Sequence, residues 1–105
     1  RDILHRLSET LASRKHADPE KSYTAKLFAD GPDSILKKIG EECAELIMAG
    51  KDGKRLPIVR ESTDVIYHIL VLLAFFDMGI EDVSQEMRRR EGISGIDEKA
   101  SRGQK

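Results

Sequence analysis

The sequence has no tryptophan, few aromatic residues and a single cysteine. Phe, Trp and Tyr make up 5% of the 105 residues, although 39% are hydrophobic. A core built from this supply must use Leu, Ile, Val and Ala, which favours helices packed on helices over a β-sandwich. Cys43 has no second cysteine to pair with, and the first residues show no signal pattern. We therefore expect a cytoplasmic protein without disulfides.

The sequence also lacks an excess of charge of one sign. Its 18 Lys and Arg residues nearly balance its 19 Asp and Glu residues, for a formal net charge of −1. No overall field attracts the chain to nucleic acid or to an anionic membrane, so we expect neither partner. The apolar run from Val65 to Phe76 contains His68 and is shorter than the roughly 20 residues that span a bilayer. Any function based on charge must therefore be local.

The spacing of apolar residues predicts one all-α domain, a helical bundle of four to five helices. Asp33 or Ser34 is the expected N-cap of the second long helix, Pro57 suits the first turn of the third, and Gly79 should end it. Residues 92–105 are punctuated by Gly and Ser and predict a mobile tail without a helix. The expected helices cover residues 3–12, 35–50, 57–78 and 81–90, with a short helical or irregular piece at 25–28.

The third expected helix is apolar on nearly all sides between Val65 and Phe76. Such a helix must be covered from several directions, which is difficult in a monomer of this size. We therefore expect homodimerisation to complete the bundle.

Acidic residues gather beside the apolar stripe of the second helix. At about 100° per residue, Glu41, Glu42 and Glu45 share one arc, with Glu42 at the edge of the apolar face. Neighbouring carboxylates repel one another, and a carboxylate near the core also loses hydration. A divalent cation removes both penalties, and Mg²⁺ prefers oxygen ligands of this kind.

The third helix carries a second acidic pair, Glu61 and Asp64, spaced to lie on one face. In an antiparallel hairpin the two acidic groups face each other, because the midpoint between them falls at Gly53 in the predicted turn. Helices packed about 8–10 Å apart allow acidic side chains from both to share a metal ion. The alternative is that these carboxylates form an ordinary solvated surface.

Three groups of residues resemble a known family. Glu41-Glu42-x-x-Glu45 followed by Glu61-x-x-Asp64 resembles the signature of MazG-like all-α nucleoside triphosphate pyrophosphohydrolases. Two further segments, Ser22-Tyr23-Thr24-Ala25-Lys26-Leu27 and Glu98-Lys99-Ala100-Ser101-Arg102, resemble the phosphoribosyl-ATP pyrophosphatase family of histidine biosynthesis. The similarity runs from about Leu7 to Arg102.

The resemblance implies a MazG-like pyrophosphohydrolase domain over residues 1–91 and Mg²⁺-dependent hydrolysis of phosphoribosyl-ATP to phosphoribosyl-AMP and pyrophosphate. It implies that Glu42, Glu45, Glu61 and Asp64 are the metal ligands. Glu41 is then the catalytic candidate that orients or deprotonates water, or it holds a second ion.

Further residues are candidates for binding the substrate or supporting the metal site. Lys38 is spaced either for an ion pair with Glu42 or for contact with a phosphate. His68, one turn after Asp64, could fix that carboxylate or simply be a buried histidine with a nearby acceptor. The remaining candidates for substrate contacts are Tyr23, Thr24, Lys51 and Lys54, although Thr24 could instead cap a helix and the lysines could be merely solvated.

Two other functions remain open on the sequence. The first is a house-cleaning MazG-like enzyme that hydrolyses other nucleoside triphosphates with the same metal chemistry. The second is a helical dimerisation module without enzymatic activity, whose acidic residues only keep it soluble.

Overall fold

The computed structural model describes residues 2–103 and contains six helices over that part of the chain. In chain order they are α1 (Ile3–Ser13), α2 (Tyr23–Asp30), α3 (Pro32–Asp52), α4 (Arg55–Phe75), α5 (Ile80–Arg90) and α6 (Gly95–Gly103). The expected all-α class is confirmed. Arg1, Gln104 and Lys105, which belong to the two segments expected at 1–91 and 92–105, lie outside the described residues.

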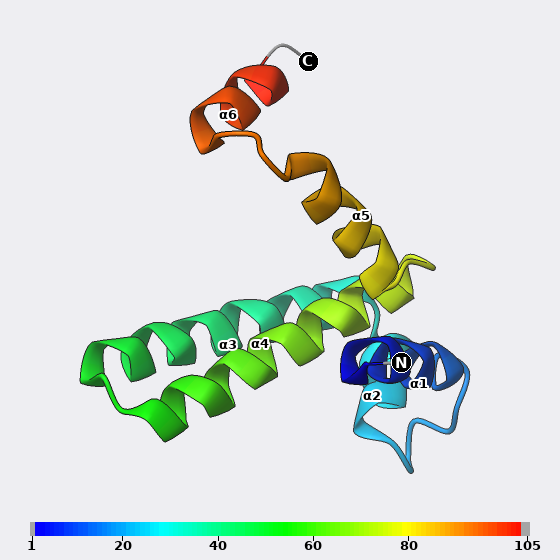
Figure 1. Ribbon diagram of the computed structural model, residues 1–105. Coiled ribbons are helices and arrows are strands. Elements are labelled where there is room, and N and C mark those ends of the chain that lie inside the picture. Colours follow the sequence, from blue (N-terminus) through cyan, green and yellow to red (C-terminus); the bar gives the residue numbers. More distant parts are fainter. Residues whose placement is uncertain (1, 104–105) are drawn as a thin grey trace.

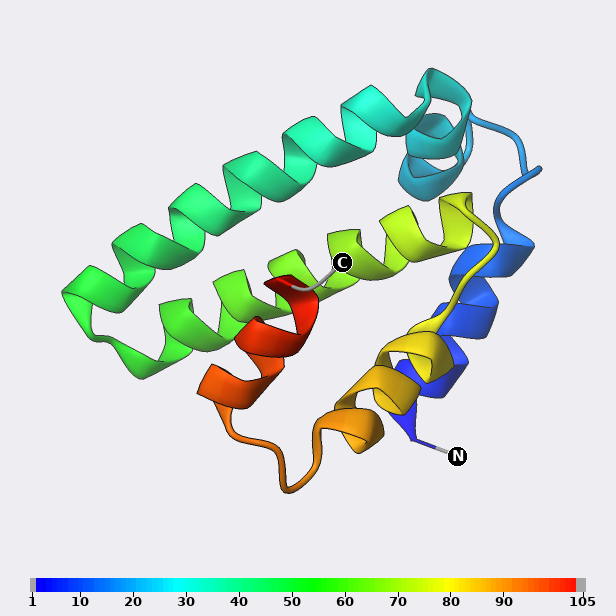
Figure 2. The same cartoon turned by 90° about the horizontal axis from the view of Figure 1, so that it is seen from above.

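Helices α3 and α4 form a long antiparallel hairpin, and α1 and α2 pack at one end of it (Figure 1). Gly53 closes the hairpin turn with φ 71°, in the left-handed region that glycine adopts without a steric penalty. The turn therefore falls at the residue about which the two acidic groups are mirrored. Figure 2 shows that α3 and α4 stay side by side along their length.

The hydrophobic core lies at the end of the hairpin away from its turn, where four helices meet. Its buried members come from α1, α2, α3 and α4: Leu11, Leu27, Phe28, Ile35, Leu70, Val71 and Ala74. Near the turn, by contrast, Ile47 and Leu56 are largely exposed. The part of the hairpin near its turn is thus a two-helix arm without a cover.

Two helix ends differ from the sequence prediction. Gly31, rather than Asp33 or Ser34, is the N-cap of α3, because its φ of 97° ends α2 and lets Pro32 start the next helix at once. Helix α4 ends at Phe75, four residues before Gly79. There Asp77 adopts φ 60°, and the Lys15 ammonium donates to the Phe75 carbonyl and the Asp77 carboxylate, both at 2.8 Å.

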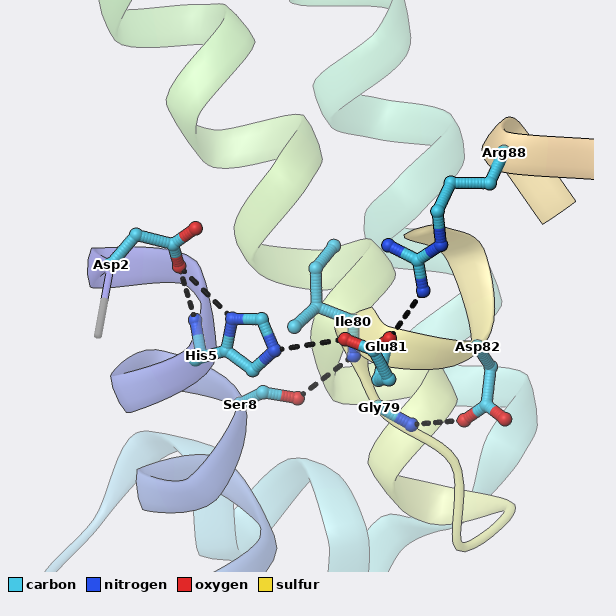
Figure 3. Close-up of polar contacts among 8 residues, drawn as sticks. All are labelled: Asp2, His5, Ser8, Gly79, Ile80, Glu81, Asp82 and Arg88. Carbon is cyan, nitrogen blue, oxygen red and sulfur yellow. Dashed lines mark hydrogen bonds and ion pairs between the residues drawn. The ribbon is translucent and has the colours of Figure 1, made fainter. Parts of the chain in front are cut away.

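Helix α5 is attached to α1 by polar contacts (Figure 3). The Ile80 amide donates to Ser8 Oγ at 3.1 Å, and His5 Nε2 lies 3.0 Å from Glu81 Oε2. Asp82 Oδ2 accepts from the Gly79 amide at 2.9 Å and caps the start of the helix. These bonds set the direction in which the chain leaves the bundle.

Helix α6 lies in the segment where we predicted no helix, which is a correction to that prediction. The Ser94 hydroxyl accepts from the Asp97 amide at 3.1 Å and caps its start. Glu98 is only 5% exposed, although it belongs to a helix with mostly polar residues. Three arginines surround its carboxylate, and this tertiary contact is not visible in the apolar spacing from which the helices were predicted.

Among the described residues, no single helix is both long and apolar enough to cross a membrane. The pair α4 and α5 meets that test only when joined, and it is bent by 106° between the two helices.

Candidate metal centre

Glu42, Glu45 and Glu61 form a carboxylate cluster that bridges the two arms of the hairpin. One carboxylate oxygen from each residue lies within 4.8 Å of the other two. Glu42 is buried, Glu61 is half-buried and Glu45 is exposed, so the cluster is open to solvent on one side. The antiparallel pairing around Gly53 brings the acids of α3 and α4 together, as the spacing predicted.

The cluster is electrostatically strained without a cation. A hydrogen bond between Glu42 and Glu45 is the main cause that raises the pKa of Glu45 and lowers the pKa of Glu42. The charge of Glu42 itself raises the pKa of Glu45 further. The opposite directions of the two pKa shifts show that the charges of these neighbouring carboxyl groups are costly together.

The donor set fits a hard divalent cation. Glu42 Oε2 and Glu61 Oε1 are buried and have no hydrogen-bond partner in the described part of the chain. A buried carboxylate oxygen without a donor is costly, and a cation coordinated by oxygen would satisfy it. Mg²⁺ and Mn²⁺ prefer such ligands over Zn²⁺-type nitrogen and sulfur sets.

Asp64 is outside the group of carboxylates that could share an ion. Its side chain is exposed, and its backbone carbonyl accepts from His68 Nδ1 at 2.7 Å. The structure thus brings together three of the four expected ligands, and it places Asp64 one turn further along α4.

Lys38 lies against the acidic cluster from the preceding turn of α3. Its ammonium is 3.4 Å from Glu41 Oε1 and 3.5 Å from Glu42 Oε1. Glu41 is half exposed and does not belong to the group of three, and Lys38 contacts both Glu41 and the cluster residue Glu42. The ion pair predicted for Lys38 is therefore present.

His68 is buried beside the cluster and joins α4 to α2. Because a carbonyl oxygen can only accept, Nδ1 carries the hydrogen and donates to the Asp64 carbonyl. The second ring nitrogen, Nε2, lies 2.9 Å from the Tyr23 hydroxyl, within hydrogen-bond distance. His68 contacts the Asp64 backbone and not its carboxylate. Burial of the Tyr23 hydroxyl raises its pKa, so Tyr23 remains a hydroxyl donor near neutral pH.

Tyr67 is a residue of this region that the sequence analysis did not select. Its hydroxyl lies 2.5 Å from Thr24 Oγ1, and Thr24 is almost fully buried. The Thr24 hydroxyl therefore joins two helices and does not cap one. The sequence does contain a signal for these contacts: Tyr67 and His68 are neighbours in the otherwise apolar stretch from Val65 to Phe76, and buried polar groups require partners.

Lys51 and Lys54 lie at the hairpin turn and are exposed. Among the described residues, neither lysine side chain makes a hydrogen bond or an ion pair, so the structure does not join them to the carboxylate cluster.

The fold and the cluster define a class of protein: an all-α chain with a carboxylate cluster carried by a helical hairpin. Residues 4–91 match the family model of phosphoribosyl-ATP pyrophosphohydrolase. This match covers most of the chain and includes the whole cluster. The chain belongs to the phosphoribosyl-ATP pyrophosphohydrolase family, which confirms the resemblance.

Curated relatives agree with that assignment. A phosphoribosyl-ATP pyrophosphatase from Dechloromonas aromatica is 88% identical over 104 residues, which cover 99% of this chain and 96% of the relative. A relative with the same name from Nitrosospira multiformis is 57% identical over 96% of this chain and 84% of the relative. Another from Geobacter sulfurreducens is 54% identical over 98% of this chain and 95% of the relative.

Proposed function

We propose that this chain hydrolyses phosphoribosyl-ATP between its α and β phosphates and releases phosphoribosyl-AMP and pyrophosphate. That reaction is the second step of histidine biosynthesis. The family match and the names of the relatives support it, and they favour a hydrolase over a dimerisation module without activity. The observation that carries the chemistry is the cluster of Glu42, Glu45 and Glu61 with two buried oxygens that have no hydrogen-bond donor.

We assign Mg²⁺ as the cofactor, with Glu42, Glu45 and Glu61 as its ligands and Asp64 as the fourth. When bound, the ion supplies charge neutralisation for phosphate oxygens and makes a coordinated water more acidic. Glu41 is exposed beside the cluster, where its carboxylate can accept a proton from attacking water or orient that water. Its partner Lys38 keeps that carboxylate close to the cluster.

Groups around the cluster are suited to binding the substrate. The Lys38 ammonium can exchange its carboxylate partners for a phosphate oxygen, because it is one third exposed. The Tyr23 side chain is half exposed, and the contact of its hydroxyl with His68 fixes its position beside the substrate. Thr24 is buried, and its contact with Tyr67 supports the helix that carries Tyr23. Lys51 and Lys54 complete the predicted set of polyphosphate contacts at the turn.

The test is Mg²⁺-dependent release of pyrophosphate from phosphoribosyl-ATP, with the mononucleotide product identified. dCTP, dUTP and ATP serve as parallel substrates. A clear preference for phosphoribosyl-ATP supports the proposal. Equal or better hydrolysis of the other triphosphates would assign the chain to the house-cleaning alternative. Hydrolysis that does not depend on Mg²⁺ would contradict the proposed metal site.

We further propose that the chain works as a homodimer in the cytoplasm. An apolar hollow of about 220 Å³ runs between α1, α4 and α5, and it is lined by Leu4, Ile66, Ile69, Leu70, Leu73, Ile80, Val83 and Met87. Ile66, Ile69 and Met87 are 38–65% exposed, which is costly for a monomer. We still predict that residues 1–91 form the pyrophosphohydrolase domain and that residues 92–105 form a segment that moves relative to this domain.

A further inference from the structure

The segment Glu98-Lys99-Ala100-Ser101-Arg102 lies in α6, and one face of it contacts α5. Glu98, Ser101 and Arg102 are spaced three and four residues apart, and together with Glu86 and Arg89 of α5 they line a hollow of about 260 Å³. The carboxylate cluster contributes no residue to this hollow. The motif therefore builds a separate polar site between two helices.

Arginine side chains outnumber carboxylates in the ion-pair cluster at this hollow. Arg89 donates to Glu86 and, at 2.7 Å, to Glu98, while Arg90 also contacts both carboxylates. Together with Arg102, three guanidinium groups pair with two carboxylates, and two of the three, Arg89 and Arg102, line the hollow. Guanidinium groups offer several N–H donors in a planar fork that matches phosphate oxygens.

Arg102 has donors to spare. In the stretch of chain that the structure describes, its contact is an ion pair at 3.4 Å from Nε to Glu98 Oε2, and its side chain is half exposed. None of its five N–H groups makes a hydrogen bond with the described residues. These donors are available to an anion, because the side chain lines the hollow and is half exposed.

Glu98, in contrast to Arg102, has a carboxylate oxygen that lacks a hydrogen-bond donor. Its residue is 5% exposed, and Oε2 has no hydrogen-bond partner among the described residues. The hydrogen bond from Arg89 lowers the pKa of Glu98, so the group is an ionised acceptor near neutral pH. A hydroxyl group of a ligand would satisfy this buried oxygen.

We propose that the hollow between α5 and α6 binds a phosphorylated sugar, with the phosphate on Arg89 and Arg102 and a sugar hydroxyl on Glu98. At about 260 Å³ the hollow is smaller than the roughly 300–1,000 Å³ of pockets for drug-sized ligands, which suits a phosphorylated pentose better than a complete nucleotide. The sugar phosphate comes either from the phosphoribosyl group of the substrate, an assignment that rests on the proposed function, or from a free sugar phosphate.

The binding test is calorimetric titration of the full chain with ribose 5-phosphate, inorganic phosphate and ribose. Ribose 5-phosphate binds more tightly than either fragment, and Arg102→Gln weakens it about tenfold because one charged hydrogen-bond donor is lost. Arg88→Gln is the matched control, because Arg88 lies on α5 and pairs with Glu81, and neither residue lines the hollow. Circular dichroism verifies that both variants keep the helix content of the unsubstituted chain.

Two results would overturn the proposal: no preference of the unsubstituted chain for ribose 5-phosphate, or equal weakening of binding by both arginine substitutions.

Steady-state kinetics then separate the two sources of the sugar phosphate. A KM for phosphoribosyl-ATP that rises about tenfold in Arg102→Gln, with kcat changed less than about twofold, assigns the hollow to the substrate. An unchanged KM together with lost ribose 5-phosphate binding assigns it to a free sugar phosphate. Absence of turnover in the unsubstituted chain would refute the proposed function without affecting the titration.

Discussion

Glu41 and Glu45 are neighbours on α3, yet their surroundings differ. Glu45 belongs to the carboxylate cluster, and its pKa is raised chiefly by its hydrogen bond with Glu42. Glu41 is outside that group and pairs with Lys38 at 3.4 Å. Two residues of the same type, one turn apart, are therefore expected to have separate roles.

The first prediction concerns these two roles. Glu45→Gln removes a ligand and should abolish the Mg²⁺-induced rise in Tm, because an ion that binds the folded state stabilises it. Glu41→Gln should keep that rise and lower kcat by about 10² or more, the usual contribution of a general base. Thermal melts with and without Mg²⁺ and initial rates measure both effects. Equal loss of Mg²⁺ binding in the two variants would contradict the division.

The second prediction concerns the close contact between Gly79 and Ser8. A Cβ at Gly79 would lie 2.8 Å from Ser8 Oγ, the acceptor of the Ile80 amide. Gly79→Ala should therefore displace the hydroxyl and destabilise the fold by about 1–2 kcal/mol. Gly50→Ala is the control: it lies inside α3 with no atom within 4 Å of the added Cβ. It should stabilise by about 0.5–1 kcal/mol. Urea denaturation gives both values, and an unchanged Gly79→Ala midpoint would be the contrary result.

Helices α1 and α5 are joined by an ion pair that depends on pH. His5 contacts Glu81 and Asp2, and these hydrogen bonds raise the pKa of His5 above its ordinary 6.5. The pKa values of both partner carboxyl groups are lowered. Hydrogen bonds from Arg88, and then from His5, lower the pKa of Glu81, and hydrogen bonds from His5 lower the pKa of Asp2. A pair of this kind stabilises the fold only while both partners are charged.

The third prediction follows from the signs of these shifts. The contribution of His5 is fully present below pH 6.5 and is lost as the pH rises through its folded value. The contribution of Glu81 is present above 4.5 and is lost as the pH falls through its own folded value. The unsubstituted chain should therefore exceed His5→Gln in stability most clearly near pH 5–6. Urea midpoints from pH 5 to 9 measure the difference, and a constant difference would show that the pair contributes nothing.

In the part of the molecule that the structure describes, apolar surface is left where α1, α4 and α5 meet. The core covers one end of the hairpin, while Ile66 and Ile69 of α4 and Met87 of α5 stay partly exposed around a hollow. A second copy is the occupant expected for this surface, because it would bury these side chains symmetrically.

The fourth prediction tests that occupant. Ile69→Glu should shift the chain from dimer to monomer, because a charge cannot be buried in an apolar interface without a partner. Ile96→Glu is the control, since Ile96 is 83% exposed on α6 and does not line the hollow. Light scattering over a range of concentrations reports the mass. A monomeric unsubstituted chain, or loss of the dimer in both variants, would remove α4 from the interface.

The apolar period and the turn residues were sufficient to predict the all-α class and the hairpin of α3 and α4. Helix periodicity and the mirror position of Gly53 are local properties, so the approach of Glu42 and Glu45 to Glu61 could be derived from residue spacing. Helix ends were harder, because Gly31 with φ 97° overrode the polar cap expected at Asp33 or Ser34.

Long-range contacts required the three-dimensional structure. Nothing in the local pattern shows that Tyr67 meets Thr24 or that His68 meets Tyr23, because these pairs are far apart in the chain. Helix α6 was missed for the same reason: its apolar residues are few, and Glu98 is buried by arginines from α5 rather than by a hydrophobic face. Side-chain periodicity reports which face of a helix is apolar, whereas the choice of partner for a polar group depends on how the helices pack.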